Sequence, residues 1–202
     1  LGIRDPFNVL FMPAGPERQW MQGQIAPLMT NLGNYGFRVT TSSEEAQKFF
    51  NQGLNLYYGF NHLEAYRSFR EAARLDPSCA MCWWGQALSL GPNINAPMDR
   101  SDAMVVYKAV RRAQVNATTA TPLEQGLIDA IAKRYVAEAP EDRTPLDQAY
   151  AEAMKALQMK FPDNDEVTTL TSEALMDLHP WDYWLRDGKP QSWTPEILAL
   201  ME

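Results

Sequence analysis

Small and apolar side chains recur at intervals of three and four residues along most of the chain beyond residue 42, and short polar stretches separate these blocks. The spacing is typical of amphipathic α-helices that bury one face. The stretch 91–97 is too rich in Gly, Pro and Asn to be helical, so we expect it to form a loop. Helices are predicted over 43–58, 62–75, 78–90, 101–115, 122–137, 145–160, 165–177 and 195–202.

Several of these predicted helices begin with a capping pattern. Ser42–Glu45 and Thr121–Glu124 have the spacing of a capping box, in which two side chains satisfy free backbone N–H groups at a helix start. Thr144 and Thr194 each precede a proline, which the first turn tolerates because the missing N–H needs no partner there. The patterns therefore place these helix starts.

A 34-residue spacing of the tetratricopeptide type is visible when the unit is taken to start at residue 46. Gly53 and Ala65 are then the small residues at which two helices of a hairpin cross closely. Phe69 fills the gap between that hairpin and the next, and Ala72 is a further small position. Pro77 follows the second helix. The pattern predicts helix–turn–helix repeats.

The spacing continues less regularly in the rest of the chain. A second unit begins at Ala80 and places Trp83 in the core, a third spans 121–161, and a fourth opens at Asp165. We therefore expect residues 42–202 to form an all-α superhelix of about three and a half such repeats.

Residues 1–41 are predicted to form an extended or irregular N-terminal arm. Prolines at positions 6, 13, 16 and 27, together with scattered glycines, disfavour regular helix there. Only the stretch 19–32 is compatible with a short helix.

Five stretches carry a more specific resemblance, namely 50–54, 58–65, 79–85, 90–95 and 179–184. Over roughly residues 28–202 the chain resembles the N-terminal part of a family of exported bacterial tetratricopeptide proteins. The resemblance implies the repeat fold and export, so that the protein would be periplasmic or extracellular with its signal peptide removed. It implies no particular activity.

Charge and hydropathy narrow the classes of partner. The chain has 18 Lys and Arg against 25 Asp and Glu, a net charge of −7, and no basic patch that would release counterions from a nucleic acid. No run approaches the ~18 apolar residues of a membrane-spanning helix. We expect neither a nucleic-acid partner nor a membrane span.

Cys79 and Cys82 lie three residues apart at an expected helix start, so both face one side. A local disulfide or inert packing is the favoured interpretation, because no strand precedes the pair as in a thioredoxin-like site. Free redox thiols, activated by the helix N-terminus, are the second alternative. Metal ligation together with His62 and His179 is the third, and requires distant residues to meet.

No catalytic constellation is present, so the chain is not expected to be an enzyme or to need a cofactor. His62 and His179 are the two histidines, and each is expected to hydrogen-bond a carbonyl in its turn or loop. Asn116 begins an Asn-X-Thr pattern, which leaves open whether it is glycosylated.

The aromatic residues are the candidates for an interaction surface, because they are not all required by the repeat core. These candidates are Trp84, Trp181, Tyr183, Trp184 and Trp193.

The sequence therefore predicts a scaffold that binds a protein or peptide, with metal or redox handling at Cys79 and Cys82 as the alternative. Self-assembly is a further hypothesis. Residues 1–20 contain apolar stretches, and Ile197, Leu198 and Leu200 would leave an apolar end, so that one protomer could cover the next in a ring or filament. The favoured alternative is that the chain is a fragment and that further repeats follow residue 202, as in the longer proteins that it resembles.

Overall fold

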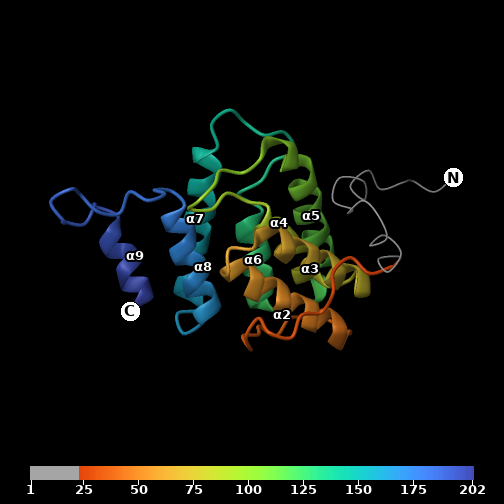
Figure 1. The fold of residues 1–202 in the computed structure, drawn as a ribbon. Helices are drawn as coiled ribbons and strands as arrows, with labels where there is room; N and C mark the ends of the chain where they lie inside the picture. The colour runs from red at the N-terminus through yellow and green to blue at the C-terminus, as the bar shows by residue number, and fades with distance from the viewer. Residues whose placement is uncertain (1–22) are drawn as a thin grey trace.

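The structure, a computed structural model, describes residues 23–202. Within this range the chain forms eight α-helices and no β-strand, so the predicted all-α class is confirmed. Two isolated bridges, Asn93–Ala96 and Trp184–Pro190, lie in loops. The helices of Figure 1 are α2 (Glu44–Tyr58), α3 (His62–Leu75), α4 (Ala80–Ser89), α5 (Ala103–Asn116), α6 (Pro122–Ile131), α7 (Thr144–Lys160), α8 (Asp165–Met176) and α9 (Thr194–Met201).

Each helix packs against the next one in the chain. α4 also contacts α2 and α6, so it lies in the middle of the array (Figure 1). α9 lies at the edge and packs on α8. One core cluster includes buried side chains from all these helices. In the part of the chain that the structure describes, no helix is long and apolar enough to cross a membrane.

Phe69 fixes the distance between the first three helices. Its ring is fully buried, and a Cβ atom added at Gly53 would lie 2.7 Å from it. A Cβ at Gly85 of α4 would lie only 2.3 Å from the same ring. Ala65 and Ala72 are also fully buried. Two of the positions expected from the repeat spacing, Gly53 and Phe69, therefore meet, and Gly85 brings α4 against the same ring.

The helix bounds differ from the prediction mainly at α6, which ends at Ile131 rather than near residue 137. The N–H groups of Lys133 and Arg134 donate to carbonyls three residues earlier, both at 3.0 Å, so the helix tightens and stops. This turn directs Arg134 inward, where it is buried.

Arg134 holds α7 and α8 together through buried ion pairs. Its guanidinium lies 3.1 Å from Asp147 and 2.7 Å from Asp177, and it stacks over the Tyr150 ring at 4.7 Å. Arg143 also pairs with Asp147, at 3.0 Å. Breaking a buried pair of this kind usually costs about 3–5 kcal/mol, because the remaining charge stays buried.

Residues 23–41 have no helix, so the suggestion of a short helix at 19–32 is wrong for the described residues 23–32. The segment is irregular, as expected, but it packs on the helices, with Ala26 and Val39 buried in the common core. Gln47 of α2 accepts from Val39 N at 3.0 Å and donates to Phe37 O at 2.9 Å. A single carboxamide thereby binds an N–H and a C=O of the extended chain.

Gln52, one and a half turns further along α2, repeats this arrangement. It accepts from Met29 N at 2.7 Å and donates to Pro27 O at 2.9 Å, and it is itself buried against Ser68. Two carboxamides of one helix therefore hold the backbone of the N-terminal segment at residues 27–29 and 37–39, on either side of a bend.

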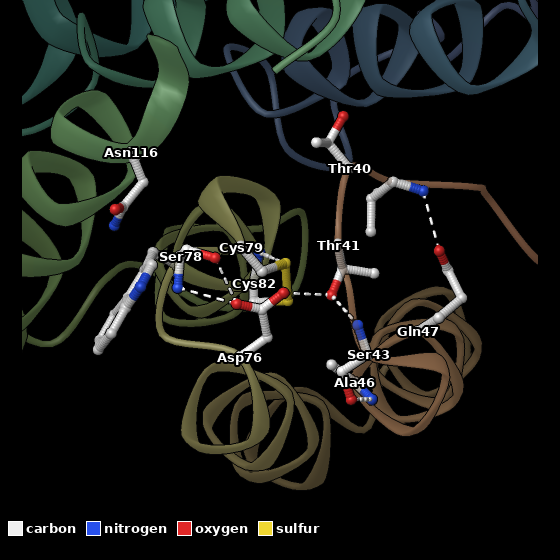
Figure 2. The surroundings of a disulfide bond; sticks show 12 residues. Thr40, Thr41, Ser43, Ala46, Gln47, Asp76, Ser78, Cys79, Cys82 and Asn116 are labelled. Atoms are coloured by element: carbon white, nitrogen blue, oxygen red, sulfur yellow. Dashed lines mark hydrogen bonds between the residues drawn. A yellow bond between two sulfur atoms is a disulfide. The ribbon is translucent and has the colours of Figure 1, made fainter. Parts of the chain in front are cut away.

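Asp76 anchors the end of this segment at the turn before α4 (Figure 2). Its carboxylate accepts from Thr41 Oγ1 at 2.5 Å, from Ser42 N at 3.1 Å and from Ser78 Oγ at 2.5 Å. Burial raises the pKa of Asp76, but these hydrogen bonds outweigh burial and leave the pKa below its usual value. The bonds join the start of α2 to the start of α4.

Replacing Gly85 by Ala should destabilise the protein by about 1–3 kcal/mol, because the new methyl group overlaps the buried Phe69 ring. The higher helix propensity of Ala, about 1 kcal/mol, does not offset this. Gly126→Ala is the matched control, since its Cβ would meet the terminal methyl groups of Leu157, a flexible aliphatic side chain rather than a rigid ring. Urea unfolding measures both, and a Gly85→Ala variant at least as stable as Gly126→Ala would contradict the packing described.

Candidate functional site

A cavity of about 620 Å³ lies between the α2–α3 turn, the loop before α5, and helices α8 and α9. This volume is in the range of small-molecule sites in proteins. Its wall is mostly apolar, and its polar groups come mainly from α8. The lining includes Tyr57, Tyr58, Phe60, His62, Ile94, Thr168, Ser172, Glu173, Met176 and Leu200.

Phe60 lies at the edge of this cavity in a backbone conformation that favours glycine. Its φ is +58°, its N–H donates to Tyr57 O, and the N–H of Asn61 donates to Leu56 O. This is the Schellman ending of a helix, whose left-handed position is usually a glycine. A Phe in this conformation strains the backbone, and Phe60 does not recover that energy by burial, since it is 54% exposed. The ring is therefore displayed rather than buried.

Glu173 of α8 places a carboxyl group in the cavity. It accepts a hydrogen bond from Tyr57 Oη, and Asp177 and Glu166 lie near it. Burial, and then the negative charge of Asp177, raise the pKa of Glu173 to about 7, although Tyr57 and Arg134 act in the opposite direction. Glu173 therefore changes charge near neutral pH.

Glu166 follows the lining residue Asp165 on α8, and its carboxylate already accepts two hydrogen bonds. It accepts from Tyr58 Oη at 2.8 Å and from Tyr35 Oη, so it ties the N-terminal segment and α2 to α8. Burial raises its pKa, and the two tyrosines lower it.

His62 lines the cavity without a hydrogen bond to either ring nitrogen from any described residue. The expectation that it bonds a turn carbonyl is therefore wrong. Its ring packs edge-on against Tyr57 and Phe60, with centroids 5.1 Å and 5.8 Å apart. Burial lowers the pKa of His62, so the ring is neutral at pH 7.

The loop between α8 and α9 displays two of the tryptophans expected to be exposed. Trp181 is 72% exposed and Trp184 is 54% exposed, with Leu185 beside them in the chain at 45%. Trp181 has φ +61°, the same strained region as Phe60. Among the described residues other than glycine, these two aromatics alone have positive φ.

This loop is held by hydrogen bonds within it, and Tyr183 and Trp193 also pack against the core. Leu185 N donates to Lys189 O at 2.8 Å, and Gln191 N donates to Tyr183 O at 3.0 Å. The indole N–H of Trp193 donates to Asp182 O at 2.8 Å. The exposed indoles are therefore presented on a structured loop.

The remaining aromatic candidates are less available. Trp193 stacks on His179, with ring centroids 3.8 Å apart, and Tyr183 donates to Met176 O at 3.1 Å; both are partly buried. His179 is thus held by stacking. These residues support the loop that carries Trp181.

Trp84 is 1% exposed, so the expectation that it contributes to a surface is wrong. α4 contacts four other helices, and nearly all its side chains are enclosed. Trp83, which the repeat spacing placed in the core, is instead half-buried and donates to Pro77 O at 3.0 Å. The sequence did not reveal that Trp84, rather than Trp83, is the enclosed residue of the pair.

Cys79 and Cys82 form a disulfide at the start of α4 and are both fully buried (Figure 2). Cys79 is the N-cap residue, and its sulfur accepts from Cys82 N at 3.1 Å. Within residues 23–202, no three His, Cys, Asp or Glu side chains are grouped in a way that could hold a metal ion. The histidines therefore do not complete a site with this pair.

Sequence reasoning missed the cavity, because its walls come from four parts of the chain. One local signal was present. Phe60 follows the end of a helix at the position where Gly is usual, and it follows Tyr57 and Tyr58 in the sequence.

Comparisons of the chain with protein-family models, with curated proteins and with solved structures found no match in any of the three. The function must therefore be inferred from the residues and their geometry.

Glu173→Gln should change how stability depends on pH. The pKa of Glu173 is raised from 4.5 to about 7 on folding, so the folded state holds the proton more tightly and stability falls as pH rises through this window. The Gln variant keeps a side-chain oxygen that can accept the hydrogen bond from Tyr57, and it does not lose stability through this titration. It should equal the wild type near pH 4.5 and exceed it by about 1–3 kcal/mol at pH 8.

Urea unfolding at both pH values measures the difference between the two proteins. Burial raises the pKa of Asp177 to about 6. Its titration therefore also lowers stability as pH rises, in the wild type and in the variant alike. Parallel stability curves for wild type and variant would show that Glu173 does not titrate in this range.

Proposed function

We propose that the chain is a tetratricopeptide-like scaffold acting outside the cytoplasm, without catalysis, and that it binds a protein or peptide through the exposed loop between α8 and α9. The observation that carries this proposal is Trp181. A bulky residue in the left-handed region costs stability, and such strain is usually retained where it serves function. Here it holds an indole in solvent, next to Trp184 and Leu185.

Exposed aromatic side chains on a fixed loop are suited to protein recognition. Trp and Tyr are enriched among the residues that dominate binding energy at interfaces. A loop with its own hydrogen bonds loses little conformational entropy when it binds. The net charge of −7 favours a partner that is neutral or basic.

The packing supports the repeat interpretation. Phe69 lies between Gly53 and Gly85, which is where the repeat spacing puts the contact between successive hairpins. α4 contacts both α2 and α6, as expected when first helices of consecutive hairpins stack.

The path of residues 27–39 supports a capacity for peptide binding by this architecture. Gln47 and Gln52 each bind an N–H and a C=O of that segment, so the face of α2 recognises non-helical backbone within its own chain. Such contacts recognise backbone groups and tolerate many side chains.

A location outside the cytoplasm is supported by the disulfide between Cys79 and Cys82, since such bonds persist mainly in oxidising compartments. The alternative of redox or metal handling has less support. Both sulfurs are enclosed by the core, and an attacking thiolate needs access to a sulfur atom.

Self-assembly remains a hypothesis for this protein. The hypothesis needs contact between residues 1–20 of one protomer and the C-terminal helix of the next. Residues 1–20 lie outside the described residues. In α9, Ile197 is buried against the core, Leu200 is partly buried, and Leu198 and Met201 are exposed. The apolar end is therefore smaller than the sequence suggested.

The test begins with peptides selected from a display library on the immobilised wild-type protein. The double variant Trp181→Ala/Trp184→Ala should bind a selected peptide at least about ten-fold more weakly, since truncating one such anchor typically costs more than 1 kcal/mol. Met159→Ala, which removes an exposed side chain from α7, is the control and should bind as the wild type does. Equal affinity of wild type and double variant in calorimetry would refute a role of this loop.

A further inference from the structure

The cavity bounded by the α2–α3 turn, α8 and α9 carries negative charge that no neighbouring side chain of its lining neutralises. Among the described residues, Asp165, Glu173 and Glu202 line it, and no lysine or arginine does. His62, also in the lining, has a lowered pKa because of burial and brings no positive charge at neutral pH. A bound anion would therefore be repelled.

The depth of Glu173 distinguishes it from the acids at the edge. Asp165 and Glu202 are exposed to solvent, where water screens their charge. The Glu173 carboxyl is enclosed, and Tyr57 supplies the one hydrogen bond that it receives from the described residues. A carboxylate has about four acceptor positions, so this group has capacity left for a donor that enters the cavity.

The walls around this carboxyl group are aromatic and aliphatic. Tyr57, Tyr58 and Phe60 line one side, and Ile94 and Met176 line others. Aromatic faces attract cations, and the attraction grows when the cation is removed from water. An apolar wall around one buried carboxyl group fits a ligand that has an apolar body and a single positive end.

We propose that this cavity binds an ammonium group carried on an apolar chain, with Glu173 accepting hydrogen bonds from the ammonium and the aromatic rings packing on the chain. The ammonium is either that of a free amine or that of a lysine side chain. The inference does not rest on the proposed function, since it concerns residues of the cavity and none of the loop that carries Trp181.

Binding should strengthen as pH rises, because the carboxyl form of Glu173 cannot attract a cation. Its pKa is about 7, whereas an aliphatic ammonium titrates near pH ~10 and stays charged throughout. The charged and titratable groups around Glu173 are Tyr57 and Tyr58 on α2, His62 on α3, Arg134 after α6, Tyr150 on α7, Asp165 and Glu166 on α8, Asp177 after α8, and Glu202. Of these, His62 loses positive charge as pH rises, with its pKa already below 6.5, and Asp177 gains negative charge near pH 6.

The experiment uses calorimetry to compare three probes that share a phenyl ring on a four-carbon chain and differ in the end group: 4-phenylbutylamine, 4-phenylbutanol and 4-phenylbutanoate. At pH 8 the amine should bind at least about ten-fold more tightly than the alcohol. The amine should bind about ten-fold more weakly at pH 6 than at pH 8, because a single carboxyl group with a pKa of about 7 is mostly protonated at pH 6. An acetylated pentapeptide with a central lysine is the second source of ammonium. Binding of either source supports the proposal, and tightest binding of the alcohol or the butanoate overturns it.

Variants separate a contact with Glu173 from a general effect of negative charge. Glu173→Gln should remove the preference for the amine and its pH dependence, and leave affinity for the alcohol within about two-fold. Asp163→Asn removes an exposed carboxylate just before α8 that does not line the cavity, and should change neither. Phe60→Leu, which retains an apolar side chain, should weaken binding of the amine more than that of the alcohol. Unchanged amine affinity in Glu173→Gln, with the native near-ultraviolet spectrum kept, overturns the proposal.

Discussion

The buried guanidinium of Arg134 is the interaction on which the second half of the structure depends. It lies where α6 ends, and it pairs with Asp147 and Asp177. One positive charge thereby joins α7 to the end of α8. The charge of Arg134 also acts on Glu173, which lies near Asp177 and Glu166 as well. Burial, and then the negative charge of Asp177, raises the pKa of Glu173, and the positive charge of Arg134 acts in the opposite direction. The ion pairs that join α7 to α8 therefore also act on the carboxyl group in the cavity.

Much of the helical fold could be predicted from the sequence, because helix starts and close contacts have local signatures. The capping box at Thr121 forms with Glu124 as expected. Gly53 and Phe69 indicated the crossing of α2 and α3, since a Cβ atom at Gly53 would lie 2.7 Å from the Phe69 ring. The early end of α6 had no such signature. It depends on Arg134 finding its partners 13 and 43 residues further along the chain.

The candidate site was predictable only in part, for the same reason. Trp181 and Trp184 could be proposed as exposed because they lie in a loop that no repeat position requires. Trp84 could not be separated from Trp83, since both are adjacent aromatics on a helix whose surroundings depend on four other helices. The cavity needs the α2–α3 turn, the loop before α5, and α8 and α9 to meet. No short stretch of sequence contains that information.

The central claim is that this chain gives up stability to display aromatic rings, and it can be tested without a known ligand. Phe60 and Trp181 have positive φ and are exposed, so glycine should suit both backbones better. The free energy of unfolding of Phe60→Gly and of Trp181→Gly, measured in urea, tests this directly. The account predicts that each variant is more stable than the wild type, by up to about 1 kcal/mol, the usual cost of a left-handed residue with a side chain. A loss of stability in both variants would show that the rings are held for packing, and would contradict the account.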